Sequence, residues 1–333
     1  MRLTTMNSAA ELSERASASW RSLHRASHLS EIRAGLERDG FYVGMLVNDL
    51  QNQHYAHKVS LVPKGVSADI ATDALLSLLD DFHPGYGDDP VALVSSFANH
   101  LLQESTDGTG MLLELHGLSD KYVMTRSSRR RSRQGGHRPL DKLIPSLGYI
   151  PSWTVVGSRT DLKQLAIDRD MPRTVIPSTR VRKIKMRATN EANWQRTIKQ
   201  LRKVDKVKGA VSLRKHSWSG YDFPEQVRTQ SLAVAATTAP IGWDARGTFN
   251  ESFTSPYSTY RQLRFVQFWV ELLEDSVAFL NGFTGRESLY GEAAFTFTLE
   301  GLSSSLELTN AMEDIRSGSL SVDEARKTYL SRR

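Results

Sequence analysis

Two adjacent carboxylates, Asp88 and Asp89, are the sequence's clearest candidates for metal-dependent chemistry. Paired aspartates can hold two magnesium ions where a polymerase or nuclease acts on nucleic acid. Such a pair is expected at a hairpin between apolar strands, whereas here Pro90 follows directly. This order favours Asp89 as a helix N-cap with Pro90 in the first helical position. A metal-dependent nucleic-acid-processing enzyme that uses Asp88 and Asp89 therefore remains an alternative and not the leading hypothesis.

His54 and His57 stand three residues apart and form the only other candidate metal pair. No Glu lies between them as in the zinc-protease motif, and no third ligand is suggested by spacing. The chain has no cysteine, no phosphate-binding glycine loop of either common type and no nucleophile elbow. We therefore expect a protein that is not an enzyme and that carries no cofactor and no metal.

Basic residues are concentrated in two stretches, although the formal net charge is only +6. Between residues 180 and 215, many Lys and Arg residues face only two acids, Glu191 and Asp205. Residues 193–208 predict a short helix that could present charge over most of its circumference, with Arg196, Lys199, Arg202, Lys203, Lys206 and Lys208. The second stretch contains Arg126, Arg129, Arg130, Arg131, Arg133 and Arg138.

Such a surface favours a polyanionic neighbour, and contact with a DNA backbone would be independent of base sequence and sensitive to salt. No helix-turn-helix context suggests that bases are read. An acidic protein partner, or a face that is simply solvated, is also compatible with these charges.

The composition is that of an ordinary globular chain, with 39% hydrophobic and 24% charged residues among 333. No signal peptide is recognisable, and no apolar run approaches the roughly 18 residues that would span a bilayer. We expect a soluble protein made in the cytoplasm, without membrane contact.

The elements predicted in the first half alternate between helix and strand. The first forty residues are expected to be helical, residues 41–47 to be a strand, and residues 63–67 to be a turn. Helices are expected after Ser67 and after Asp89, followed by a hairpin of residues 111–116 and 121–125. Short strands are expected at residues 143–145, 153–156, 174–177 and 180–186.

In the second half, helices are predicted at residues 193–208, 224–238 and 259–280, with polar connections at 209–223 and 239–256. Asn281-Gly282 is expected to end the long helix, and a strand is expected at 295–299. A further helix through Ala311 is expected to end at Gly318, and residues 321–324 have capping-box spacing. These elements predict an α+β fold.

Five segments are similar in sequence, and in their order along the chain, to segments of one known family. They are residues 91–117, 140–145, 175–184, 256–261 and 317–326. Together they resemble the portal proteins of tailed bacteriophages, and residues 317–326 are the closest match.

This resemblance implies a subunit with a β-rich wing region, a short stem or clip segment and a long tunnel-facing helix. The implied parts are an N-terminal helical arm and strand (1–66), a wing-like region (67–188), a basic stem or clip-like segment (189–223), the tunnel-facing helix and strand (224–300) and crown-like helices (301–333). The resemblance implies no catalytic role for the Arg, Lys and acidic residues named above.

The implied function is structural: a ring of about twelve subunits at one capsid vertex of the virion, through which DNA is packaged and ejected. The implied partners are further copies of the chain, double-stranded DNA bound without sequence specificity, and the terminase, head-tail adaptor and capsid proteins. A nucleic-acid-binding virion or regulatory protein that forms no ring is the alternative.

Overall fold

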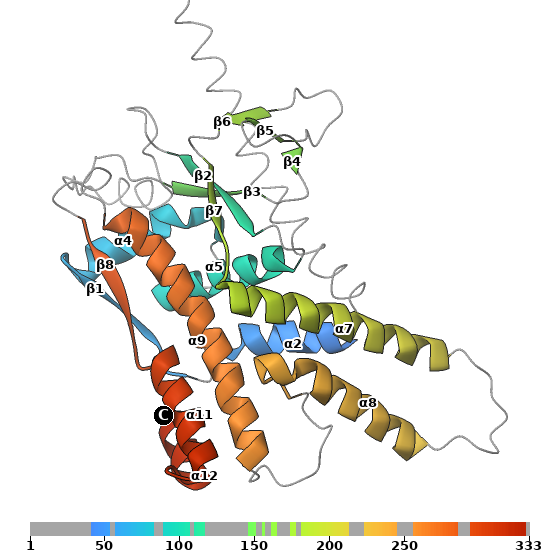
Figure 1. The fold of residues 1–333 in the computed structure, drawn as a ribbon. Helices are drawn as coiled ribbons and strands as arrows, with labels where there is room; N and C mark the ends of the chain where they lie inside the picture. Colours follow the sequence, from blue (N-terminus) through green and yellow to red (C-terminus); the bar gives the residue numbers. More distant parts are fainter. Residues whose placement is uncertain are drawn as a thin grey trace, which may run out of the picture.

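The computed structural model describes residues 41–53, 57–82, 89–106, 110–116, 146–150, 155–156, 161–164, 174–177, 181–212, 223–244, 256–285 and 294–330. Within these residues the fold is α+β, with helices packed around one long central helix, two small antiparallel sheets toward one end and a third alongside that helix (Figure 1). The predicted helical arm of residues 1–40 lies outside the described residues. No described helix is long and apolar enough to cross a membrane.

The first described element is a helix, α2 (Phe41–Gln51), where the sequence predicted a strand. The prediction was wrong because it stopped at residue 47, before the repeat of the apolar residues was complete. Tyr42, Val43, Leu46 and Leu50 are buried, and this spacing places them on one face of a helix.

Two predicted helices and their first residues are confirmed. Helix α4 (Ala68–Leu78) has Ser67 as N-cap and is followed by a short 3-10 helix, η1 (Asp80–Phe82). Helix α5 (Pro90–Ser105) has Asp89 as N-cap, whose Oδ1 accepts a hydrogen bond of 3.1 Å from the backbone N–H of Val91. Asp89 is therefore used in capping a helix, as its position before Pro90 suggested.

A three-stranded antiparallel sheet has β2 (Met111–His116) at its centre, between β3 (Ser146–Ile150) and β7 (Val181–Ile184). The described partners of β2 are thus distant in sequence, and the predicted hairpin partner, residues 121–125, lies outside the described residues. A second sheet contains β4 (Val155–Val156), β5 (Asp161–Gln164) and β6 (Thr174–Pro177).

The third sheet joins the two ends of the described chain. Strand β1 (Ser60–Lys64) pairs antiparallel with β8 (Thr296–Glu300), so that Pro63 lies opposite Phe297. The strand predicted at residues 295–299 is confirmed within one residue, but its partner was missed because Pro63 and Lys64 were assigned to a turn. Proline is tolerated in a strand where no ladder hydrogen bond is required from its nitrogen.

Helix α7 (Ala188–Ser212) has 25 residues and extends beyond the predicted range of 193–208 at both ends. Its neighbour α8 (Phe223–Thr238) confirms the predicted helix there. A short 3-10 helix, η3 (Ala239–Ile241), follows and ends at Gly242, which has a φ of 76°.

The central element is α9 (Pro256–Thr284), a helix of 29 residues that is buried on more than one side, as its apolar residues predicted. It passes through Asn281 and Gly282, so the predicted stop at these two residues was wrong. It also begins at Pro256, which places Tyr257 and Ser258 in its first turn.

The closing segment is confirmed in detail. Helix α11 (Ser305–Ser317) begins with a capping box of Ser304 and Glu307 and ends at Gly318, which has a φ of 82°. Helix α12 (Val322–Ala325) begins with the predicted capping box of Ser321 and Glu324, and a π-helical turn, η5 (Arg326–Leu330), follows.

One continuous hydrophobic core links these elements. It contains Leu46 of α2, Phe97 of α5, Trp194 of α7, Phe268 of α9 and Leu308 of α11, all nearly inaccessible to solvent. Each of the five predicted parts thus contributes one of these residues to the core. The division into five parts stays a prediction.

Candidate binding surface

One face of α7 is fixed in the core. Trp194, Ile198 and Leu201 are buried on it, and the ring of Trp194 stacks on Phe268 with a centroid separation of 6.1 Å. The indole N–H of Trp194 donates a hydrogen bond of 3.1 Å to the hydroxyl of Thr106. The prediction that charge covers most of the helix circumference was therefore wrong, because these apolar side chains occupy a full face.

The opposite face carries Arg196, Lys199 and Lys203, which are exposed and are called here the α7 basic stripe. Their spacing of three and four residues aligns them along the helix over about 10 Å. Among the residues that the structure describes, no hydrogen bond or ion pair involves any of the three. Within that part of the chain, the stripe is a rigidly held row of positive charge without a counter-charge.

The acids of α7 point elsewhere. Glu191 is half-buried and lies 3.8 Å from Lys185. Asp205 is also half-buried and accepts a hydrogen bond of 3.2 Å from the backbone N–H of Tyr42 on α2. Neither carboxylate offsets the charge of the stripe on the outer face.

The other predicted contact residues are placed less simply. Arg202 is half-buried and already interacts within the chain. Lys206 and Lys208 belong to α7, but their side chains are not among those that the structure describes. Arg129, Arg130 and Arg131 lie outside the described residues.

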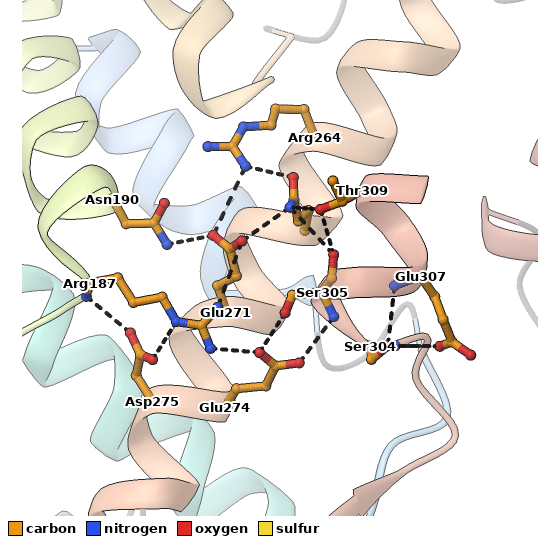
Figure 2. Close-up of polar contacts among 11 residues, drawn as sticks. Arg187, Asn190, Arg264, Glu271, Glu274, Asp275, Ser304, Ser305, Glu307 and Thr309 are labelled. Carbon is orange, nitrogen blue, oxygen red and sulfur yellow. Dashed lines mark hydrogen bonds and ion pairs between the residues drawn. The ribbon is translucent and has the colours of Figure 1, made fainter. Parts of the chain in front are cut away.

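Arg187, directly before α7, attaches the beginning of this helix to α9. The guanidinium of Arg187 donates to Asp275 at 2.8 Å and to Glu274 at 2.7 Å, and its backbone N–H donates to Asp275 at 3.1 Å (Figure 2). One turn into α7, the amide of Asn190 donates to Glu271 at 2.6 Å. Three carboxylates of α9 therefore hold the N-terminal end of α7.

The same stretch of α9 also holds α11. Glu274 accepts hydrogen bonds from the backbone N–H and the hydroxyl of Ser305, at 3.0 and 2.8 Å (Figure 2). Gln267 donates to the hydroxyl of Thr309 at 2.7 Å. Burial by itself raises the pKa of Glu274, but the hydrogen bonds from Ser305 and the charge and hydrogen bond of Arg187 outweigh it and hold the pKa below its usual value.

Sequence reasoning missed this junction of α7, α9 and α11. Its signal was present, because Glu271, Glu274 and Asp275 interrupt an otherwise apolar helix at spacings of three and four residues. Charges so placed within a buried helix require partners, and the partners come from segments far away in sequence.

The structure describes only one member of each candidate metal pair, Asp89 and His57. Within the described residues no group of three or more His, Asp or Glu side chains is placed to hold a metal. Asp88 and His54 lie outside those residues, and Asp89 caps α5. His57 stacks on Trp269 with a centroid separation of 5.5 Å, and burial lowers its pKa.

Comparisons of this chain with protein-family models, with curated proteins and with solved structures find no match.

Proposed function

We propose that this protein is a structural subunit of a phage portal, a ring at one capsid vertex through which DNA is packaged and ejected. The observation that carries the proposal is the order of the described elements. Helix α5 leads into strand β2, α9 begins at Pro256, and the turn at Gly318 leads into the capping box of α12. Each lies in a segment on which the resemblance to portal proteins rests.

The organisation of α9 also supports a structural role. It is a central helix against which α5, α11 and β8 pack, and Trp194 of α7 stacks on its Phe268 (Figure 1). A ring that conducts DNA needs rigid subunits, since each contact between copies must repeat with the same geometry around the axis. Terminase, the head-tail adaptor and the capsid are the partners that this role implies, and the virion is its location.

The α7 basic stripe gives the subunit a surface for an anionic neighbour. DNA that slides through a ring requires diffuse contacts with its phosphates and no grip on its bases. The stripe fits this requirement chemically, and it fits an acidic protein surface equally well.

A nucleic-acid-binding protein that forms no ring is the second candidate, and the α7 basic stripe is the observation that favours it. In that role the stripe would itself provide the phosphate contacts, with an affinity that falls steeply as salt rises. A monomer or dimer of the 37.3 kDa chain would then be the active form.

Molecular mass separates the two candidates. Light scattering coupled to size-exclusion chromatography, with negative-stain images, should show assemblies many times heavier than 37.3 kDa and a ring outline. A chain that stays monomeric at high concentration across several salt concentrations, yet binds unrelated DNA duplexes, would favour the second candidate and contradict the ring.

A further inference from the structure

The outer surface of α11 differs from that of α7 in charge. Leu306 is 68% exposed there, and Asn310 and Glu313 continue the same line along the helix. We call these three residues the α11 outer face. Exposed Glu307 and Asp314 flank them, and the helix carries a single basic residue, Arg316.

This face is held firmly in place. Leu308, Ala311 and Met312 on the opposite side of α11 are buried in the core, and Ser305 is bonded to Glu274. The α11 outer face is therefore presented on a helix that is fixed at its start and along its length, as the α7 basic stripe is.

The two faces can be aligned so that opposite charges meet at one position. On α7, exposed Ala192 precedes Lys199 by seven residues, and on α11, Leu306 precedes Glu313 by the same interval. Seven residues correspond to about 10 Å of helix. If the helices lie parallel, Leu306 falls on Ala192, which is small enough to let it approach, while Glu313 falls opposite Lys199.

We propose that the α7 basic stripe of one copy binds the α11 outer face of a second copy. The proposal rests on the ring proposed above and assigns the partner of its basic surface. Leu306 contributes the apolar area of the contact, and the charges fix its register, because exposed ion pairs alone add little affinity. DNA bound to the stripe would leave Leu306 exposed to solvent and would not involve Glu313.

The contact has to form between copies. Both faces are exposed in the single chain, and α7 and α11 lie on different sides of α9 (Figure 1). Because the two faces are different, each copy can bind one neighbour through α7 and another through α11. This is the heterologous type of contact, which closes into a ring when its rotation allows.

The absence of native cysteines makes a specific cross-link possible. In the variant Ala192→Cys/Leu306→Cys, the proposed contact brings two Cβ atoms within disulfide reach, about 4 Å. Mild oxidation should give a ladder of dimers, trimers and larger species on a non-reducing gel, since each copy carries both halves of the contact. Ala192→Cys/Ser319→Cys, with the second cysteine at another exposed position, is the matched control. A missing ladder, or an equal ladder in the control, would overturn the proposal.

Charge exchange gives an independent test. Lys199→Glu and Glu313→Lys should each weaken assembly, because like charges then meet in every contact. An equal mixture of the two variants should recover it, because alternating copies restore opposite charges at both contacts. Lys64→Glu, at an exposed position on β1, should assemble as the unaltered chain does.

The outcomes distinguish this inference from the proposed function. Rings that form normally in Lys199→Glu, with reduced affinity for a DNA duplex, would assign the stripe to DNA and leave the portal proposal standing. A mixture that recovers nothing, while the unaltered chain forms rings, would also reject only this contact. An unaltered chain that is monomeric at every concentration would reject both.

Discussion

The side-chain amide of Asn281 forms both possible hydrogen bonds with the backbone of Phe297. Its oxygen accepts from the Phe297 N–H at 2.8 Å, and its nitrogen donates to the Phe297 carbonyl at 2.9 Å. Across the sheet, Phe297 faces Pro63, which has no N–H to offer. The Asn281 side chain, near the end of α9, thus forms with Phe297 of β8 the two backbone hydrogen bonds that a neighbouring strand would otherwise provide.

Replacing Asn281 should therefore weaken the junction between α9 and β8. Asn281→Ala leaves a buried N–H and a buried carbonyl of Phe297 without partners, which should cost about 1–3 kcal/mol of unfolding free energy. Urea unfolding followed by circular dichroism measures the loss. Gln200→Ala, at an exposed position of α7, should change stability by less than about 0.5 kcal/mol. An Asn281 variant no less stable than this control would contradict the assigned role.

Two glycines should respond in opposite directions to the same substitution. A Cβ at Gly242 would lie 2.3 Å from the carbonyl oxygen of Arg261, and the φ of 76° disfavours any other residue there. Gly242→Ala should thus destabilise the protein by at least about 2 kcal/mol. A Cβ at Gly282 would meet no atom within 4 Å, and Gly282 lies inside α9. Gly282→Ala should therefore raise stability by about 0.5–1 kcal/mol.

Thermal unfolding of both glycine variants provides the measurement. If Gly282→Ala lowered the melting temperature, the helix would end where the sequence first suggested, at Asn281-Gly282. If Gly242→Ala were neutral, the close approach of η3 to α9 would be wrong.

Arg261 is a buried cation whose partners are neutral. Its guanidinium donates to the carbonyl oxygens of Ala235 and Trp243 and to the hydroxyl of Thr238, and the residue is 3% exposed. No carboxylate lies within ion-pair distance of it in the described part of the chain. Arg261→Met should cost on the order of 3 kcal/mol, because these acceptors would lose their donors. Arg316→Met, at an exposed site on α11, is the control and should leave the urea midpoint nearly unchanged.

Acid should loosen the junction of α7, α9 and α11. The pKa of Glu274 is lower in the folded protein than its value of about 4.3 in an unfolded chain. The stabilisation from this carboxylate is therefore complete above that value and is lost as pH falls through the folded pKa. Urea midpoints between pH 7 and pH 3 should fall less steeply in Glu274→Gln than in the unaltered chain. Glu300→Gln, exposed at the end of β8, should retain the original steepness.

The sequence by itself determined the elements whose signals are local. Asp89 before Pro90, the capping box at Ser321, and Gly318 after α11 each act over three or four residues, and the structure places them as predicted. The capping box at Ser304 is equally local, although it was not predicted. The apolar repeat of α9 likewise required only neighbouring residues. Arg196, Lys199 and Lys203 were among six basic residues predicted to present charge over most of one helix, and these three are exposed on it.

Tertiary structure decided everything that depends on residues far apart in the chain. Strand β1 has β8 as its partner from the other end of the chain, and the side chain of Asn281, within α9, is hydrogen-bonded to Phe297 of β8. The junction of Arg187, Glu274 and Ser305 joins three helices, and no local pattern specifies which carboxylate meets which donor. Helical periodicity could identify the basic residues of α7, but only the packing of Trp194 against Phe268 determined which face of that helix remains free.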